Sequence, residues 1–273
     1  MKLSLAVALL GDLNLALKAA LLPTVRDVIA RPKLLLMPKI LSQTFMAHVW
    51  TVFGAGTDEA ARAVKENLIT LHARGVVLDI GAAGHGHTVT YLQRRKVHKY
   101  VALEPNVLMH QRIRENANLA GYTEGNGSLI ILPYGADNAP AIIQTLSSVD
   151  GPPFDTLVSV LTMCSIRDSQ RVLTRLVAEV LKPGGQLLFY EHVLSPRADV
   201  AWWQRFWSPL WKVWFDGCRL DCPTHLWIDG MMTPDVHGTL KSMWSERKVW
   251  GKEGEPDENL FWHRVGQYIK NVE

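Results

Sequence analysis

The chain has 273 residues, of which 48% are hydrophobic and 20% are charged, and its formal net charge is +3. This length and composition suit one large α/β domain with its own core, together with additional segments. The small net charge, with Lys and Arg scattered among acids, argues against a nucleic-acid partner. Three cysteines are too few for a disulfide framework, so they indicate a reducing, intracellular compartment.

The N-terminal segment, residues 1–56, is apolar but interrupted. Asp12, Asn14 and Lys18 break a run rich in Leu and Ala, and Pro23 is expected to end any helix there. A membrane-spanning helix and a cleaved signal peptide are therefore both disfavoured. Two interpretations stay open. The segment is either an amphipathic stretch that associates with a membrane surface, continued by the basic and apolar residues 31–39, or a helical lid over the main domain.

The main domain, expected to span residues 57–273, begins with a helix at 57–71 and a buried strand at 76–80. Helices and strands then alternate. The expected helices are 87–96, 107–119, 139–146 and 169–181, and the expected strands are 100–103, 128–133, 156–161 and 186–190. Because parallel neighbours need crossover connections, which are usually helical, this rhythm predicts a Rossmann-like, doubly wound, mostly parallel α/β sheet.

The first candidate ligand loop follows the strand at residues 76–80. In an open α/β sheet the ligand lies beyond the carboxyl ends of the strands, near the point where the strand order reverses. Small residues at 81–86 let the backbone approach such a ligand closely before the next helix. The contacts expected in this loop are Asp79, Gly81, Ala82, Ala83, Gly84 and His85.

Two further loops place acids at the same edge of the predicted sheet. Glu104 ends the second strand and is followed by Pro105 and Asn106, where a carboxylate can accept hydrogen bonds from both hydroxyls of a ribose. Ala136 and Asp137 follow the third strand, where the carboxylate can accept the exocyclic amine of an adenine. The three loops together predict a nucleoside-containing cofactor.

The charge in the first loop separates two classes of cofactor. Gly81, Gly84 and Gly86 are spaced as G-x-x-G-x-G, whereas the dinucleotide fingerprint is G-x-G-x-x-G. The carboxylate of Asp79 would repel a pyrophosphate, but it suits a ligand that bears a sulfonium and an ammonium group. The sequence therefore predicts S-adenosylmethionine as the cofactor, with a nicotinamide cofactor as the less favoured alternative.

The second half of the chain carries narrower motifs. They are LTMCSI at 161–166, LKPGG at 181–185, EHV at 191–193 and DGC at 216–218. With these motifs, residues 76–221 resemble class I S-adenosylmethionine-dependent methyltransferases of type 11, and among them the methyltransferase-like 7 family of membrane-associated thiol methyltransferases. The resemblance implies a seven-stranded sheet, a thiol acceptor, and Leu161 and Thr162 as further cofactor contacts. Ala83 and His85 stand where the family usually has glycine.

The catalytic side chains are expected after the fifth strand. Methyl transfer from a sulfonium mainly requires alignment of the reacting atoms and exclusion of water. A thiol, whose pKa is near about 8.5, needs only modest help in losing its proton. His192 is the candidate for that help, with Glu191 orienting it; alternatively, His192 only bonds the backbone at the strand end.

The cysteines are assigned no metal. Cys164, at the end of the fourth strand, is expected to be a buried packing residue. Cys218 and Cys222 have no further ligands nearby in the sequence, so a zinc site is not predicted.

An aromatic helix is expected within an insertion at about residues 196–223. Trp203, Trp207, Trp211 and Trp214 are spaced by four, four and three, so they share one helical face. This face could cover the acceptor site, lie in a membrane interface, contact a partner or pack in the core.

The expected activity is methylation of a hydrophobic small molecule, with a thiol sulfur as the favoured acceptor. O- or N-methylation of a lipophilic metabolite is the near alternative, and a cofactor-binding scaffold without turnover is the alternative from another class. The protein is expected to be a monomer or homodimer, either cytoplasmic or peripherally attached to an endomembrane such as the endoplasmic reticulum.

Overall fold

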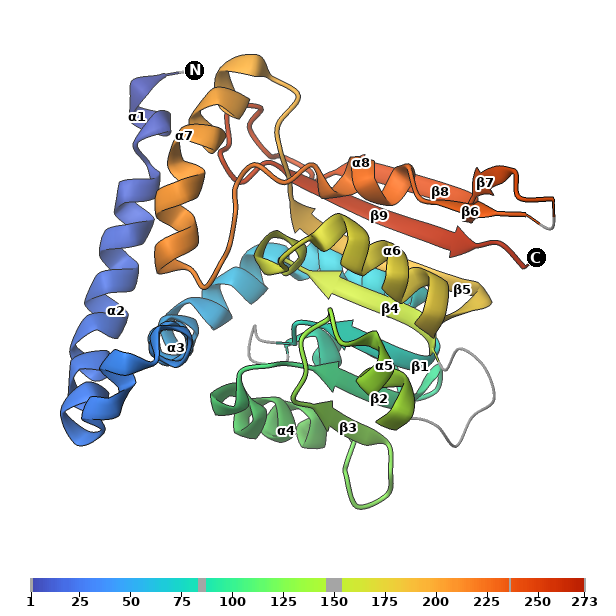
Figure 1. Ribbon diagram of the computed structural model, residues 1–273, viewed down its shortest axis with the longest axis horizontal. Helices are drawn as coiled ribbons and strands as arrows, with labels where there is room; N and C mark the ends of the chain where they lie inside the picture. The colour runs from blue at the N-terminus through green and yellow to red at the C-terminus, as the bar shows by residue number, and fades with distance from the viewer. Residues whose placement is uncertain (1, 83–86, 146–153, 236, 273) are drawn as a thin grey trace.

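A seven-stranded sheet forms the centre of the computed structural model, which describes residues 2–82, 87–145, 154–235 and 237–272 (Figure 1). The strand order is β3-β2-β1-β4-β5-β9-β8. The strands are β1 (Gly75–Ile80), β2 (Val97–Leu103), β3 (Leu129–Leu132), β4 (Phe154–Val160), β5 (Leu181–His192), β8 (Trp244–Gly251) and β9 (His263–Lys270). The first five are parallel, and β9 runs antiparallel to both β5 and β8. This arrangement confirms the predicted Rossmann-like, mostly parallel sheet.

Helices cover both faces of the sheet. They are α4 (His110–Leu119), α5 (Ala139–Thr145), α6 (Ser169–Val180), α7 (Ala198–Trp214) and α8 (Thr224–Asp229), besides the N-terminal α1 (Leu3–Ala6), α2 (Leu9–Ala30) and α3 (Pro38–Lys65). Neighbouring residues of a strand point to opposite faces. Leu78 accordingly packs in one core with residues of α5 and α6, whereas Val77 packs in a second core with residues of α3 and α4. A separate hairpin is formed by β6 (Met232–Pro234) and β7 (Leu240–Ser242).

Two predicted helices differ from the structure. The helix expected at 57–71 is the last part of the longer α3, which continues as a π-helical turn, η2 (Glu66–Thr70). The helix expected at 87–96 is only a 3-10 turn, η3 (His87–Tyr91). Gln93 ends it early, because its carbonyl accepts the amides of Lys96 and Val97 and so starts β2 three residues sooner than predicted.

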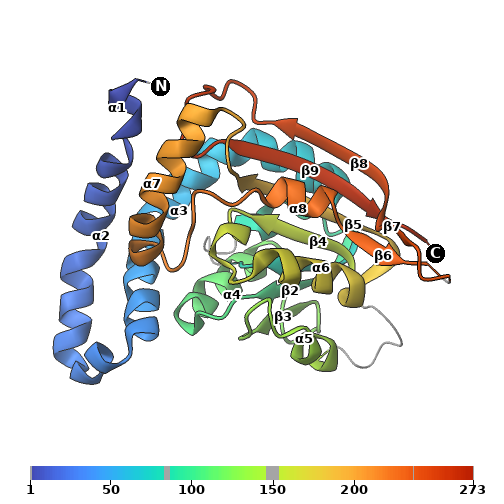
Figure 2. The same cartoon turned by 45° about the horizontal axis from the view of Figure 1, so that its top comes forward.

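The N-terminal helices pack beside α7 (Figure 2). α2 continues through Pro23, so the prediction that this proline ends the helix is wrong. A proline removes one backbone hydrogen bond, but packing of α2 against α3 preserves the helix. Trp207 donates its indole N–H to the carbonyl of Ala6 at 2.7 Å, and the ring of Trp214 lies 5.9 Å from that of Phe45. The tryptophan face thus contacts the N-terminal helices.

One helical stretch among the described residues, Leu3–Ala30, is long and apolar enough to cross a membrane. Only 22% of the most apolar 18-residue part of this stretch is buried. The exposed side chains of this stretch include Leu10, Leu15, Leu21, Leu22 and Ile29. A buried core helix would not leave so many large apolar side chains uncovered.

Candidate functional site

The carboxyl ends of four parallel strands bring the predicted ligand loops together. Ile80 pairs with Leu103 of β2 on one side and with Ser159 of β4 on the other, and Leu103 pairs with Leu132 of β3. The residues that follow these strand ends are therefore neighbours in space. The edge gathers Gly81, Glu104, Ala136 and Leu161, four of the predicted ligand contacts.

Asp79 is a buried acid just before the end of β1, with 1% of its surface exposed. The hydroxyl of Tyr100 donates to its Oδ2 at 2.8 Å. Burial raises the pKa of Asp79 to about 6, and hydrogen bonds from Tyr100 and Thr88 counter this only in part. A buried carboxylate is costly without a positive partner, so this position suits a cationic ligand.

Gly81 makes the turn after β1 possible. Its φ is +69°, a conformation that glycine adopts without strain. A Cβ on Gly81 would lie 2.2 Å from Cγ2 of Thr162, whose hydroxyl donates to the Gly81 carbonyl at 3.2 Å. The next residue, Ala82, is buried. Of the other predicted contacts in this turn, Ala83, Gly84 and His85 lie outside the described residues.

Glu104 is the second buried acid, with 3% of its surface exposed at the end of β2. Its Oε1 accepts the backbone amide of Asn106 at 2.7 Å, while no hydrogen bond from the described residues reaches Oε2. Burial raises the pKa of Glu104 to about 7, and the charge of Asp216 adds to the rise. The side-chain Nδ2 of Asn106 donates to the carbonyl of Gln43 at 3.0 Å, which ties this loop to α3. Pro105, which separates Glu104 from Asn106 in the sequence, is exposed.

The third loop reaches the surface. Ala136 is buried, but Asp137 is exposed, and its Oδ1 would lie 2.4 Å from a Cβ placed on Gly135. Glycine at 135 thus allows the carboxylate of Asp137 to fold back over the loop. Its contact with an adenine stays a prediction.

Glu191 shapes the loop after β4. Its carboxylate is fully buried and accepts the hydroxyl of Ser159 at 2.7 Å and the backbone amides of Thr162 and Met163 at 3.0 and 3.2 Å. These bonds hold Leu161 in a left-handed conformation, with φ of 53°. The expected orientation of His192 by Glu191 does not match these contacts, because successive strand residues point to opposite faces.

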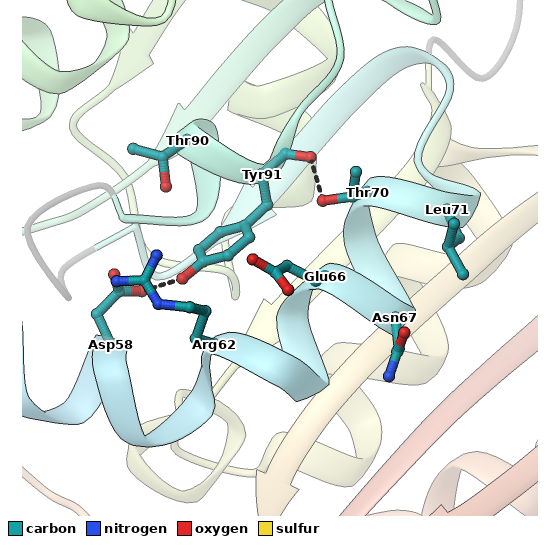
Figure 3. Close-up of a pocket in the computed structure, with 8 residues that line it drawn as sticks. All are labelled: Asp58, Arg62, Glu66, Asn67, Thr70, Leu71, Thr90 and Tyr91. Atoms are coloured by element: carbon teal, nitrogen blue, oxygen red, sulfur yellow. Dashed lines mark hydrogen bonds between the residues drawn. The ribbon is translucent and has the colours of Figure 1, made fainter.

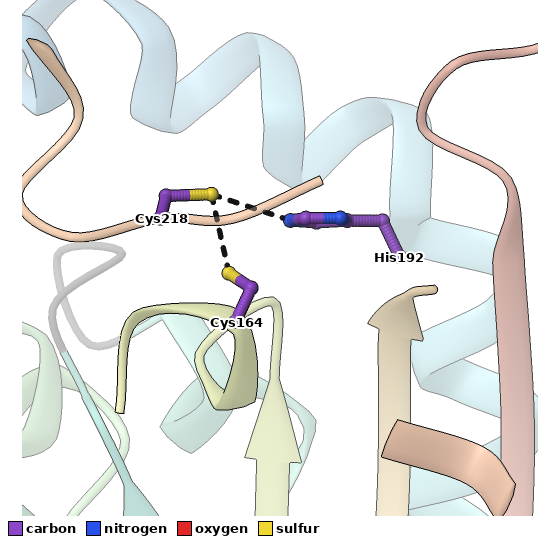
Figure 4. A group of neighbouring side chains, drawn as sticks. All are labelled: Cys164, His192 and Cys218. Atoms are coloured by element: carbon purple, nitrogen blue, oxygen red, sulfur yellow. Dashed lines mark hydrogen bonds between the residues drawn. The ribbon is translucent and has the colours of Figure 1, made fainter. Parts of the chain in front are cut away.

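His192 meets two sulfur atoms at the end of β5 (Figure 4). Its Nε2 lies 3.4 Å from Sγ of Cys218, and that sulfur lies 3.2 Å from Sγ of Cys164. The imidazole is 4% exposed, and its edge contacts the ring of Phe261. Burial alone would lower the pKa of His192, but the contacts with Cys164 and the charge of Glu191 raise it overall.

Several residues of this site were not assigned a role from the sequence. Tyr100 holds Asp79, and Asp216 brings a third carboxylate near Glu104. Cys164 and Cys218 are 54 positions apart and meet because the segment after α7 folds across the ends of β4 and β5, where the amide of Arg219 donates to the carbonyl of Cys164 at 3.2 Å. The DGC motif at 216–218 was the signal that could have suggested this.

A separate cavity of about 500 Å³ lies between α3 and η3 (Figure 3). It is lined mostly by polar side chains, and none of the predicted ligand contacts is among the lining residues. The Tyr91 hydroxyl donates to Oδ1 of Asp58 at 3.0 Å, and Lys65 pairs with the same oxygen at 2.7 Å. These bonds fasten α3 to the segment that follows the glycine turn, so we assign the cavity a structural origin.

The described residues fit S-adenosylmethionine. One buried carboxylate, Asp79, is the last residue but one of β1, the other, Glu104, directly follows the neighbouring strand β2, and the glycine turn begins at Gly81. These carboxylates suit a cationic ligand, and the unengaged Oε2 of Glu104 can accept a ribose hydroxyl. The sheet and these acids define the class of the protein, a class I methyltransferase that uses S-adenosylmethionine.

Residues 54–227 match the family described as a methyltransferase domain, and the chain belongs to that family. It is similar to the thiol S-methyltransferase TMT1B of Rattus norvegicus, with 45% identity over 87 residues, which are 32% of this chain and 34% of the relative. It is also similar to human thiol S-methyltransferase TMT1A, with 41% identity over 81 residues, 28% of this chain and 32% of the relative. The matched segment therefore spans about a third of each relative.

Solved structures show the same fold at low sequence identity. An O-methyltransferase family protein from Burkholderia thailandensis aligns with a TM-score of 0.54 and 13% identity, over 83% of this chain and 61% of that one. The YcgJ protein from Bacillus aligns with a TM-score of 0.51 and 15% identity, over 77% of this chain and 99% of that one. These likenesses concern the fold alone.

Proposed function

We propose that the protein methylates the sulfur of a hydrophobic small-molecule thiol. The observation that carries this proposal is the contact between the imidazole of His192 and a sulfur atom at the carboxyl ends of β4 and β5. The nitrogen that contacts the thiol of Cys218 has the polarity to take the proton of an acceptor thiol. The similarity to thiol S-methyltransferases over 87 residues supports the same acceptor.

In this proposal the first two strand ends bind the cofactor. Asp79 faces its positive charge, the turn at Gly81 and Ala82 lets the backbone approach it, and Glu104 accepts the ribose hydroxyls. Leu161 and Thr162 close the site from β4. When bound, S-adenosylmethionine supplies a methyl group on a cationic sulfur, which is activated without further help from the protein.

The glycine turn offers a test with a matched control. Gly81→Ala should weaken S-adenosylmethionine binding by about tenfold, because the added Cβ meets Thr162 and strains a left-handed residue. Gly127 has nearly the same φ, +71°, but open space around its Cβ position. Gly127→Ala should therefore cost stability without changing the affinity. Equal affinities of the two variants in equilibrium dialysis would disprove the close contact at the turn.

The remaining task of the protein is to take the acceptor's proton. A neutral imidazole at His192 can accept it through Nε2, and the buried surroundings exclude water. Glu191 acts indirectly, because it holds the backbone of Thr162 and Met163 in place. It is therefore a positioning residue.

The acceptor class is tested with purified protein, labelled S-adenosylmethionine and three acceptors that share one apolar skeleton but carry a thiol, a hydroxyl or an amine. The proposal expects a labelled thioether as the main product. Labelled ether or methylamine in excess over the thioether would contradict the thiol acceptor and favour O- or N-methylation. Tight cofactor binding with no labelled product from any of the three would instead favour a scaffold without turnover.

His192→Gln should slow methylation of an alkyl thiol by about tenfold at pH 7, because Gln cannot take the proton. S-adenosylmethionine affinity should stay unchanged. The deficit should shrink as the pH approaches the thiol's own pKa near about 8.5, and it should vanish for an aromatic thiol that is already ionised at pH 7. Steady-state rates across pH measure this. An equal deficit for both thiols at every pH would show that His192 is structural.

We also propose peripheral attachment to a membrane through the N-terminal helices. The stretch Leu3–Ala30 exposes large apolar side chains, and Trp202 and Phe206 of α7 are each 56% exposed nearby in the same helical layer. Such a surface suits the interface of a bilayer and a lipophilic acceptor that partitions into it. Co-sedimentation with phospholipid vesicles tests it, and an unchanged vesicle-bound fraction after Leu22→Glu and Ile29→Glu would contradict it.

A further inference from the structure

The two sulfur atoms beside His192 differ in their surroundings. Cys164 is 2% exposed, and Cys218, which contacts both Cys164 and the imidazole, is partly exposed. An imidazole can take the proton of a thiol that contacts it, and the thiolate is the nucleophile in exchange with disulfides. An accessible thiol in contact with an imidazole and with a buried second thiol is the arrangement of an attacking and a resolving cysteine.

We propose that Cys218 and Cys164 form a thiol–disulfide exchange site that takes disulfides of small organic thiols and releases the free thiols beside the methyl-transfer site. The released thiol can serve as a methyl acceptor only if the proposed thiol methylation is correct. The exchange reaction itself does not depend on that proposed function. The protein would thereby accept oxidised forms of its own substrates.

The exchange proceeds in two steps. His192 takes the proton of Cys218, and the thiolate attacks one sulfur of the disulfide RSSR; a Cys218–SR bond forms, the RS–SR bond breaks, and RS⁻ leaves and is protonated. Cys164 then attacks Sγ of Cys218; the intramolecular bond forms, and the second thiolate leaves with the proton that Cys164 gives up. One RSSR is reduced to two RSH, and two cysteines are oxidised to one disulfide. A small dithiol reductant restores the cysteines.

The geometry favours this pair over a metal centre, although Cys164, His192 and Cys218 place their ligand atoms within 4.8 Å of one another. A tetrahedral zinc ion with Zn–S near about 2.3 Å would separate its sulfurs by about 3.8 Å. Here they are 3.2 Å apart, which is shorter than that spacing by about 0.6 Å and places the two thiols in direct contact. A metal-bound histidine is usually anchored through its other nitrogen, but the buried Nδ1 of His192 has no partner in the described part of the chain.

The burial of Cys164 supports its role as the second thiol. Contact with Cys218 and burial raise the pKa of Cys164 well above its usual value, so it stays protonated while Cys218 is free. Cys164 therefore attacks only after Cys218 has formed the mixed disulfide. The order of the two steps is set by exposure and by the position of the imidazole.

The test uses the full chain without S-adenosylmethionine, so its result is independent of methyl transfer. Hydroxyethyl disulfide is added, and intact and peptide masses are followed with time. The wild type should lose the mass of two hydrogens and yield a Cys164–Cys218 cross-linked peptide. Cys164→Ser should instead retain one hydroxyethylthio group on Cys218, and Cys218→Ser should show neither product on the same timescale.

Cys222→Ser is the matched control, because Cys222 is also buried but lies outside the cluster. It should react like the wild type. His192→Gln should slow the reaction of Cys218 by about tenfold at pH 7, because glutamine cannot take the proton of the attacking thiol. Peptide mapping of the wild type alone decides the case if a variant does not fold. An adduct on Cys222, an absent cross-link, or bound zinc that must be removed before any reaction would each overturn the proposal.

Discussion

S-adenosylmethionine should bind up to about 100-fold more tightly at about pH 8 than at about pH 5.5, because both acids of the proposed cofactor site carry their charges at the higher pH. Burial raises the pKa of Asp79 to about 6 and that of Glu104 to about 7. Both groups are largely neutral at the lower pH and lose their attraction for a cation. Equilibrium dialysis across this range measures the effect. An affinity that is constant or falls with rising pH would contradict it.

Glu104→Gln removes the negative charge of this side chain but keeps its size and shape. The variant should bind more weakly than the wild type at the higher pH, and its affinity should depend less on pH, because one of the two titrating acids is gone. Glu246→Gln is the matched control, since Glu246 is exposed on β8 at the far edge of the sheet. It should titrate like the wild type. The same loss in both variants would assign the effect to overall charge.

The stability of the ligand-free protein should change with pH in the opposite sense. In the unfolded chain these carboxyls have pKa values near about 4, so between about pH 4 and 7 the folded state binds more protons than the unfolded state. The contribution of Asp79 and Glu104 to stability therefore falls as pH rises through that window. S-adenosylmethionine should accordingly raise the melting temperature more at pH 7.5 than at pH 5.5.

Glu191→Ala should lower the free energy of unfolding by about 3 to 5 kcal/mol, because it leaves three buried donors without an acceptor. These donors are the hydroxyl of Ser159 and the amides of Thr162 and Met163. Glu191→Gln keeps one carbonyl oxygen and should cost less. Urea unfolding measures the difference.

Glu179→Ala is the control for this substitution. Glu179 pairs with Arg175 on the surface of α6, where such pairs contribute at most about 1 kcal/mol. If Glu191→Ala unfolded at the same urea concentration as Glu179→Ala, the carboxylate would have no role in holding the loop after β4.

The sheet could be predicted because each parallel strand contains a short run of mostly apolar residues that is largely buried. The run at Val76–Ile80 and the acid at 104 each mark a strand end in the sequence, and the structure brings both ends to one edge. Local patterns were therefore sufficient for the strands and for the acids that follow them.

Contacts between distant segments could not be predicted in this way. The partners of Glu191 lie near the end of β4 and on the loop after it, and β5 extends through His192, two residues past its predicted end, so this acid points away from His192. The meeting of Cys164 with Cys218 depends on the path of the segment after α7. Likewise, α2 continues past Pro23 because it packs against other helices, and the sequence around the proline does not indicate this packing.

In the proposed function, the buried acids at the ends of β1 and β2 hold S-adenosylmethionine rather than a dinucleotide. Calorimetric titration of the purified chain with S-adenosylhomocysteine, S-adenosylmethionine and NAD tests it most directly. The expected result is one-to-one binding of both sulfur ligands, weakened by Glu104→Gln, and no heat with NAD. Binding of NAD without binding of either sulfur ligand would contradict the claim.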